Sequence, residues 1–184
     1  MVSQSVKNTG FTIVELLIVI VIIGVLAGIT VVAFNGIQER ARNARYASAI
    51  DSYTKALTAY KGEFGEYPST ELPPGETGNG TVCLGDKYPA ASGGFPEGRC
   101  LAYNSSYDYQ VNTAVNEALR KVMGAHPNTS DLVYRGTNRG LWYQSVGTVT
   151  RATNISYSIS GNQTCARGDK IIDGTNTRCI LSFN

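Results

Sequence analysis

One carboxylate, Glu15, lies within an apolar stretch near the amino terminus of the chain. From Phe11 the sequence runs FTIVELLIVIVIIGVLAGITVVAF and stays almost entirely apolar to Phe34. A membrane-spanning helix needs about 20 apolar residues, and the run from Leu16, completed by its flank from Phe11, provides nearly that many. An acidic side chain at the middle of such a helix costs roughly 3 kcal/mol, and less towards its ends. The sequence therefore predicts a membrane helix in which Glu15 has a partner.

Three interpretations compete for this stretch. A secretory signal would use the small residues Val25 and Ala27 before a cut at Gly28, but the apolar run exceeds the usual length of about 7–15 residues and contains Glu15. A plain single-pass anchor explains the length and gives Glu15 no partner. The third interpretation is a segment that is cut and then packs against other subunits.

The residues GFTIVE, from Gly10 to Glu15, and the apolar run after them resemble the amino terminus of type IV pilins and pseudopilins. The resemblance implies that a prepilin peptidase cuts after Gly10 on the cytoplasmic side and methylates the amine of Phe11. It also implies that Glu15 is the assembly residue, which pairs with the amino terminus of a neighbouring subunit. The chemistry agrees, because pairing an amine with a carboxylate at a helix amino terminus lowers the cost of placing both in lipid.

The same resemblance implies partners and a location. The expected partners are further copies of the chain in a helical homopolymer, the prepilin peptidase, an inner-membrane assembly platform, and the membrane before assembly. The precursor would lie in the cytoplasmic membrane and the processed chain in an extracellular filament. Since the formal net charge is +2 without long runs of one sign, no nucleic-acid partner is predicted.

Alternative functions stay open at this point. Within the family, related filaments serve motility, adhesion, DNA uptake and secretion, so a pseudopilin of a secretion or DNA-uptake machine is one alternative. The other is a secreted or membrane-anchored adhesin that acts as a single subunit.

The membrane helix departs from the commonest pilin pattern. Many pilins have a kinking proline where this chain has Val32, and the only glycines in the apolar run from Phe11 to Phe34 are Gly24 and Gly28. Their G-x-x-x-G spacing fits a close helix contact or a point of unwinding, although glycine is also common in membrane helices generally.

Four cysteines occur in the rest of the chain: Cys83, Cys100, Cys165 and Cys179. Because none has C-x-x-C spacing and the chain has one histidine, disulfides fit better than a zinc site. Disulfides place this part of the chain outside the reducing cytosol. The positive-inside rule argues mildly for the opposite orientation, since Lys7 alone precedes the run and Arg40, Arg42 and Arg45 follow it.

The four cysteines allow three pairings, and the sequence alone does not choose among them. We favour Cys83 with Cys100 and Cys165 with Cys179, because each pair closes a loop of roughly 15 residues and stabilises by about 3 kcal/mol. Many pilins carry one disulfide loop near the carboxyl terminus, so the resemblance supports the second pair only.

Other candidate sites are weaker. Arg167-Gly168-Asp169 is a tripeptide that some cell-surface receptors bind, although an exposed turn explains it equally well. Asp169 and Asp173 are weak calcium candidates, because their spacing matches no EF-hand loop. With His126 as the single histidine, no nucleophile and base can be assembled, so neither an enzyme nor a cofactor is expected.

Beyond Phe34 the pattern becomes amphipathic. Apolar residues at steps of three and four predict an inner helix face: Ile37, Ala41, Ala44, Tyr46, Ile50, Tyr53, Leu57 and Tyr60. Glu39, Arg40, Arg42 and Arg45 would form a solvated or subunit-contacting face. The helix is expected to end at Lys61-Gly62.

The predicted fold class is α+β, a pilin-like long helix packed on a carboxyl-terminal antiparallel sheet. Its expected parts are a leader (1–10), a transmembrane half-helix (11–34), an amphipathic half-helix (35–62) and a disulfide-stapled head (63–184). The head is expected to contain a loop over 70–100, a short helix through Val115 and Leu119, and about four strands. The strand segments are DLVYR, GLWYQSV, TVTRATNISYSIS and RCILSF.

Replacing Gly10 with a bulky residue such as leucine should block the cut, because the peptidase that the motif implies requires glycine before the cleaved bond. The leader of residues 1–10 should then stay attached, and the intact mass of the purified chain measures this directly. A shortened Gly10→Leu chain would contradict the assignment.

Overall fold

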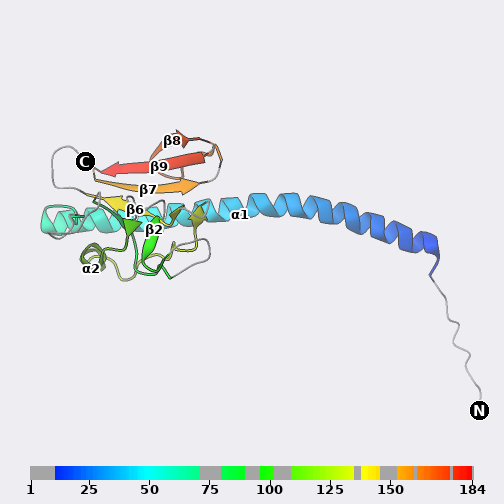
Figure 1. The fold of residues 1–184 in the computed structure, drawn as a ribbon, viewed down its shortest axis with the longest axis horizontal. Coiled ribbons are helices and arrows are strands. Elements are labelled where there is room, and N and C mark those ends of the chain that lie inside the picture. Colours follow the sequence, from blue (N-terminus) through cyan, green and yellow to red (C-terminus); the bar gives the residue numbers. More distant parts are fainter. Residues whose placement is uncertain are drawn as a thin grey trace, which may run out of the picture. The chain divides into compact units, whose positions relative to one another are not determined.

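The computed structural model describes residues 11–70, 80–89, 96–101, 109–134, 138–145, 153–159, 161–174 and 176–183. The chain divides into two compact units between Ala41 and Arg42. The first unit contains the amino-terminal part of helix α1, and the second, which we call the head, contains the rest of that helix, a second helix and all the strands (Figure 1).

Helix α1 spans Ile13–Phe64 and contributes to both units. It contains no proline, and although β-branched Ile and Val predominate in its apolar run, a helix satisfies all backbone hydrogen bonds within the segment, which an apolar environment requires. The expected end at Lys61-Gly62 is wrong, because the helix continues through Gly62. The chain leaves the helix at Gly65, whose φ of +85° is the left-handed conformation and whose N–H donates to the Lys61 carbonyl (2.8 Å).

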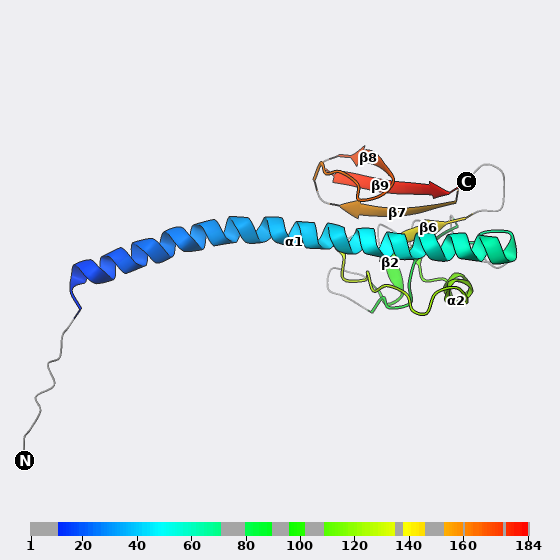
Figure 2. The same cartoon turned by 180° about the vertical axis from the view of Figure 1, so that it is seen from behind.

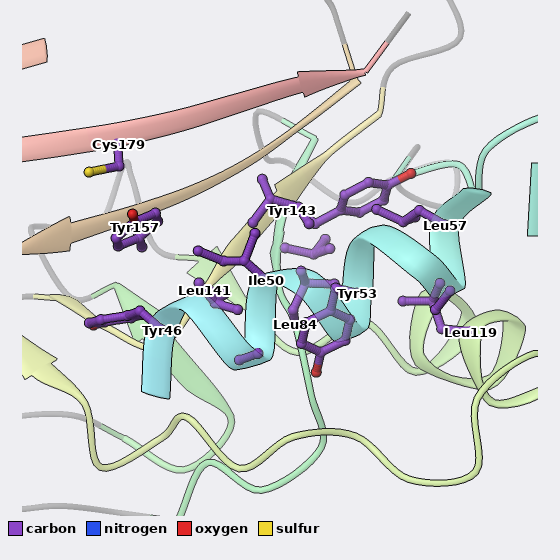
Figure 3. Close-up of a cluster of buried hydrophobic side chains, with 14 of the residues drawn as sticks. Tyr46, Ile50, Tyr53, Leu57, Leu84, Leu119, Leu141, Tyr143, Tyr157 and Cys179 are labelled. Atoms are coloured by element: carbon purple, nitrogen blue, oxygen red, sulfur yellow. The ribbon is translucent and has the colours of Figure 1, made fainter. Parts of the chain in front are cut away.

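Residues 42–64 of α1 carry the core of the head (Figure 3). Tyr46, Ile50, Tyr53 and Leu57 are at most 1% exposed, so this part of the predicted inner face is confirmed. They pack against buried side chains from other elements: Leu84, Val115, Leu119, Leu141, Tyr143, Ile155, Tyr157 and Cys179. In both views of the chain, strands β7 to β9 lie on one side of this part of α1 and α2 lies on the other (Figure 2).

The start of the predicted inner face is a different case. Ile37 is 62% exposed, and Ala41 and Ala44 are exposed as well. The buried stripe therefore begins at Tyr46, because that is the first residue of α1 that the core of the head covers.

In the part of the chain that the structure describes, the strands form two antiparallel sheets, one of five strands and one of four. The first has the order β1 (Thr81–Cys83), β6 (Trp142–Gln144), β7 (Thr153–Ile159), β9 (Asn176–Phe183) and β8 (Asp169–Asp173). The second has the order β3 (Tyr109–Gln110), β2 (Arg99–Leu101), β5 (Asn138–Arg139) and β4 (Val133–Tyr134).

The α+β fold class is confirmed, whereas the prediction of one sheet of about four strands is wrong. The segment DLVYR contains β4, which belongs to the second sheet and does not pair with the strand in GLWYQSV. Strands β1 and β2 also lie within or at the edge of the stretch 70–100, which was expected to be a loop. Strands of two or three residues are too short to show alternation of apolar and polar residues.

The predicted short helix is α2, Thr113–Arg120. Asn112 is its N-cap residue and accepts a hydrogen bond from the Val115 N–H (3.1 Å) on its side-chain oxygen. Val115 and Leu119 are buried against α1 in the core, as their spacing on one helix face requires.

A second, smaller core consists of the disulfide Cys83–Cys100 and the side chains of Tyr88 and Trp142. It is closed by Arg139, which is 1% exposed. Its guanidinium donates to three carbonyls of the disulfide-closed loop, those of Arg99 (2.7 Å), Pro89 (2.8 Å) and Pro96 (3.3 Å). A buried guanidinium that binds several carbonyls fixes the loop in one conformation, since each lost contact would leave a buried polar atom unsatisfied.

His126 joins α1 to α2 through both ring nitrogens. Its Nε2 lies 3.0 Å from the Asn116 carbonyl, which can only accept, so Nε2 carries the hydrogen and Nδ1 accepts from the Tyr53 hydroxyl (3.4 Å). Burial lowers the pKa of His126 below its ordinary value. The nearby charged groups Asp86 and Arg120 form an ion pair with each other.

Acidification should therefore destabilise the head through His126. Because its folded pKa is lowered, His126 stabilises fully above its ordinary pKa of about 6.5, and this stabilisation is lost as the pH falls through the folded value. Urea titration of the full chain in detergent should give a free energy of unfolding that falls between about pH 7 and about pH 5. The fall should be smaller in His126→Gln, which has no proton to bind in this window.

Equal pH dependence in the two proteins would contradict this role of His126. The ion-paired carboxylates do not obscure the comparison. Arg167 and Arg45 lower the pKa of Asp51 and Asp131, so the stabilisation from these carboxylates is lost only below about pH 4, in both proteins.

Candidate functional site

The amino end of α1 is closed by reciprocal hydrogen bonds between Thr12 and Glu15. The Thr12 N–H and the Thr12 hydroxyl both donate to Glu15 Oε2, over 2.9 and 2.8 Å. The Glu15 N–H donates in turn to Thr12 Oγ1 (3.2 Å). This is a capping box, in which Thr12 is the N-cap residue and Glu15 follows three positions later.

The capping box changes the view of Glu15 that the sequence alone suggested. Glu15 has partners within its own chain, and both bonds that it accepts end on Oε2. Among the described residues, no donor reaches Oε1. Thr12 is a residue of this site that our sequence interpretation missed, although the T-x-x-E signature from Thr12 to Glu15 is present in the sequence.

The amino-terminal unit exposes apolar side chains all round its helix. Every described large apolar side chain from Phe11 to Phe34 is between 51% and 85% exposed. By length and composition, α1 is apolar enough to cross a membrane, with a mean hydropathy of 3.2 over its most apolar window. A helix that is apolar on every face requires lipid or other helices around it, which suggests a membrane-inserted precursor.

The other expected residues of this segment lie as follows. Gly10 is outside the described residues, and Phe11 is 85% exposed directly before the N-cap residue. At Gly24 and Gly28 an added Cβ would meet nothing within 4 Å, so among the described residues neither glycine makes a close contact that a side chain would block.

In the head, the structure forms the two disulfides that we favoured, Cys83–Cys100 and Cys165–Cys179, each with a Cα–Cα distance of 5.7 Å. The loop closed by Cys165 and Cys179 is bound to α1. Arg167 Nε lies 2.8 Å from Asp51 Oδ1, and the Tyr157 hydroxyl accepts from the Ala166 N–H (2.9 Å). This loop is therefore part of the rigid head.

The tripeptide Arg167-Gly168-Asp169 belongs to the same loop. Its arginine is engaged by Asp51, and its glycine has a φ of +83°. A Cβ on Gly168 would come within 2.4 Å of the Ile180 carbonyl oxygen, so only glycine fits at this position. The exposed turn that we expected is present, with structural roles for Arg167 and Gly168.

Arg45 is exposed, as expected for a solvated face, and it also makes contacts within the head. It forms a two-pronged ion pair with Asp131, at 2.7 and 2.8 Å, and also donates to the Asn128 carbonyl (3.2 Å). It therefore connects α1 to the loop before β4. Sequence patterns could not indicate this pair, because the partners lie 86 residues apart.

The weak calcium candidates Asp169 and Asp173 both lie on β8. Among the described residues there is no group of three or more His, Cys, Asp or Glu that could hold a metal. Asp169 is exposed at the start of β8, and Asp173 ends the same strand.

Comparison with known proteins supports the assignment of the amino-terminal segment. Residues 6–31 match the family model described as the prokaryotic N-terminal methylation motif. The chain is 43% identical over 65 residues to the type II secretion system core protein G of Pectobacterium carotovorum subsp. carotovorum, covering 35% of this chain and 42% of that protein. The protein of the same name from Escherichia coli (strain K12) is 42% identical over 64 residues, covering 35% and 44%.

The chain thus spans less than half the length of these relatives. A comparison with solved structures found no match. The methylation motif, the long apolar helix and the antiparallel head together define a type IV pilin-like protein. Residues 6–31 carry the methylation motif, and the matching amino-terminal segment is similar to the type II secretion system core protein G.

The capping box predicts different effects for two substitutions of Thr12. Thr12→Val keeps the shape of the side chain but removes both hydrogen bonds of the hydroxyl, and it should destabilise the first turn by about 1 kcal/mol. Amide hydrogen exchange at residues 13–15, measured by NMR in detergent micelles, should then accelerate roughly fivefold. Thr12→Ser keeps the hydroxyl and should exchange like the unmodified chain. Equal rates in both variants would mean that the capping box does not hold this turn.

Proposed function

We propose that the chain is the structural subunit of a type IV pilus or a related filament. A prepilin peptidase cuts the precursor after Gly10 in the cytoplasmic membrane, and the processed chain assembles through α1 into a helical homopolymer outside the cytoplasm. The observation that carries this proposal is a helix whose described apolar side chains are exposed on all faces, with one carboxylate at its start.

The arrangement at Glu15 supports pairing between subunits. The cut after Gly10 creates a positive amine on Phe11, beside a carboxylate whose Oε2 is occupied by Thr12 while Oε1 lacks a donor among the described residues. An amine from a neighbouring subunit can reach Oε1 without breaking the capping box. Both charges are costly in an apolar environment, so their pairing favours the register that brings them together.

Filament growth needs contacts that repeat without closing. When the amine of one subunit meets the carboxylate of the next, the contact joins two different surfaces, and repeated head-to-tail contacts of this kind generate a helical polymer. The apolar side chains from Phe11 to Phe34 then leave lipid and pack against the same segments of other subunits. Helix packing in such a core replaces one apolar environment with another, so apolar burial favours no particular register. The charge pair would therefore determine which register forms.

The head fits a position outside the cytoplasm. Both disulfides lie within it, and structural disulfides persist in oxidising compartments. The adhesin alternative gains nothing from the 165–179 loop, since Arg167 of its tripeptide is bound to Asp51.

A pseudopilin role is the form of this proposal that the relatives favour. They are named as core proteins of a type II secretion system, and their similarity to this chain includes 64 or 65 residues. In that form, the filament would act with an inner-membrane assembly platform in protein secretion. The long apolar helix and Glu15 would have the same roles as in a pilus.

Glu15→Ala tests the proposal. The variant should be processed after Gly10 and inserted in the membrane like the unmodified chain, because neither step uses the carboxylate. Filament yield, measured by shearing and sedimentation in a strain that assembles the unmodified chain, should fall at least about tenfold, which corresponds to about 1.4 kcal/mol of lost pairing energy. Intact mass and membrane fractionation report on the first two steps.

Glu63→Ala is the matched control, since Glu63 is an exposed carboxylate near the other end of the same helix. It should assemble normally. Normal filament yield from Glu15→Ala would contradict the proposal. Sequencing of the mature amino terminus separates the alternatives further, because a start at methylated Phe11 supports a pilin and a start at Gly28 indicates a signal peptidase.

A further inference from the structure

The outer edge of β8 is an open sheet edge. Strand β8 (Asp169–Asp173) ends the five-stranded sheet, and among the described strands it pairs only with β9. The outward N–H and C=O groups of an edge strand can form the same ladder with another chain. An edge of this kind is a docking site when it is apolar, rigid and unguarded.

This edge is apolar on both faces. Ile171 is 48% exposed and Ile172 is 50% exposed, and Phe64 is the only other large apolar side chain of the described head that is exposed. Adjacent residues of a strand point to opposite faces, so each face of β8 presents one isoleucine. Isoleucine on both faces is typical of an interior strand of a sheet, where both faces are covered.

The edge is also held in place. The disulfide Cys165–Cys179 connects the chain before β8 to β9, and the backbone at Gly168 lies directly against Ile180. The ion pair between Arg167 and Asp51 binds the same segment to α1. Since the strand is already ordered, a ligand that pairs with it loses little of its binding energy to ordering the protein.

The residue that would guard the edge is engaged elsewhere. Natural edge strands often carry a lysine, whose charge discourages pairing with another strand. In β8 this residue is Lys170, and its ammonium group donates to the side-chain oxygen of Asn162. Lys170 keeps its charge, but Asn162 holds its side chain, and the two aspartates at the ends of the same strand outnumber it.

Self-pairing of β8 with a second copy is disfavoured by charge. In an antiparallel ladder the register changes in steps of two residues, because alternate residues of β8 point their N–H and C=O groups towards β9. Each step moves the centre of a self-pairing by one residue along the strand. A pairing centred on Ile171 places Asp169 opposite Asp173 at both ends, and one centred on Lys170 places two lysines opposite each other. Like charges directly opposite each other are destabilising. A pairing centred on Ile172 places Ile171 opposite Asp173, and it includes only residues 171–173 of each strand.

We infer that the outer edge of β8 binds an extended segment of a different protein, in which a central apolar pair lies between Lys or Arg residues. Such a segment would add a sixth strand to the sheet. Its basic residues would lie opposite Asp169 and Asp173, and its apolar residues would cover Ile171 and Ile172. The inference does not depend on filament assembly, because it concerns the head alone.

A labelled peptide tests this inference on the full chain in detergent. The probe is acetyl-Thr-Lys-Val-Ile-Thr-Lys-Thr-amide, and two controls are a version with both lysines replaced by glutamate and a version with alternate backbone nitrogens methylated. Fluorescence anisotropy should show the probe binding at least about tenfold more tightly than either control, a difference of about 1.4 kcal/mol. Equal binding of either control would overturn the inference.

Variants of the chain locate the site. The double variant Ile171→Ser, Ile172→Ser should lose at least about tenfold in affinity for the probe. Phe64→Ser, which removes an exposed apolar side chain outside β8, should bind as the unmodified chain does. Near-ultraviolet circular dichroism checks that the double variant keeps its folded head. Unchanged probe binding by the folded double variant would overturn the inference.

Two other occupants are outcomes of the same experiments. Analytical ultracentrifugation of the unmodified chain and the double variant would reveal self-association through β8. Flotation with vesicles that contain anionic lipid would reveal a membrane contact through the isoleucines. If the double variant abolishes either kind of association while the probe does not bind, the edge serves that occupant and the inference is wrong.

Discussion

A carboxylate can stay charged in an apolar helix only while hydrogen bonds or a positive charge replace the water it has lost. Thr12 provides two such bonds to Glu15 within the single chain. The amine that would form at Phe11 provides a charge of the required sign, and it exists only after the leader is removed. Processing and assembly would then be linked by one charge, because the precursor carries the carboxylate without this amine.

Helix α1 is exposed in the first unit of the chain and packed on one face in the second. Up to Ala41 the helix exposes apolar residues on all faces and obtains no cover from its own unit. From Tyr46 its apolar residues lie on one face and are covered by a core that includes β6, β7, β9 and α2. Two disulfides and the ion pairs Arg45–Asp131 and Arg167–Asp51 hold the loops of the head to each other and to the helix. The head can therefore stay rigid while the environment of the first unit changes.

Local patterns in the sequence predicted the parts of this structure that depend on near neighbours. The apolar run, the stripe from Tyr46 to Leu57 and the short helix around Val115 follow from spacing within one element. The second sheet and the partner of Arg45 depend on contacts between distant segments, for which periodicity carries no signal. Burial of Arg139 was equally invisible, because its carbonyl partners come from a loop that the disulfide closes. The capping box is present in the sequence as T-x-x-E, so the local role of Glu15 could have been predicted beside its expected role between subunits.

The glycine at position 168 has a consequence for how short motifs are interpreted. The backbone there admits no side chain, and the preceding arginine forms an exposed ion pair with Asp51. The glycine of the receptor-binding tripeptide is thus set by the fold, and a coincidental match needs only an arginine before it and an aspartate after it. The information that the tripeptide carries about cell-surface receptors is correspondingly small. Any relative with this loop geometry would retain the glycine for a reason unrelated to adhesion.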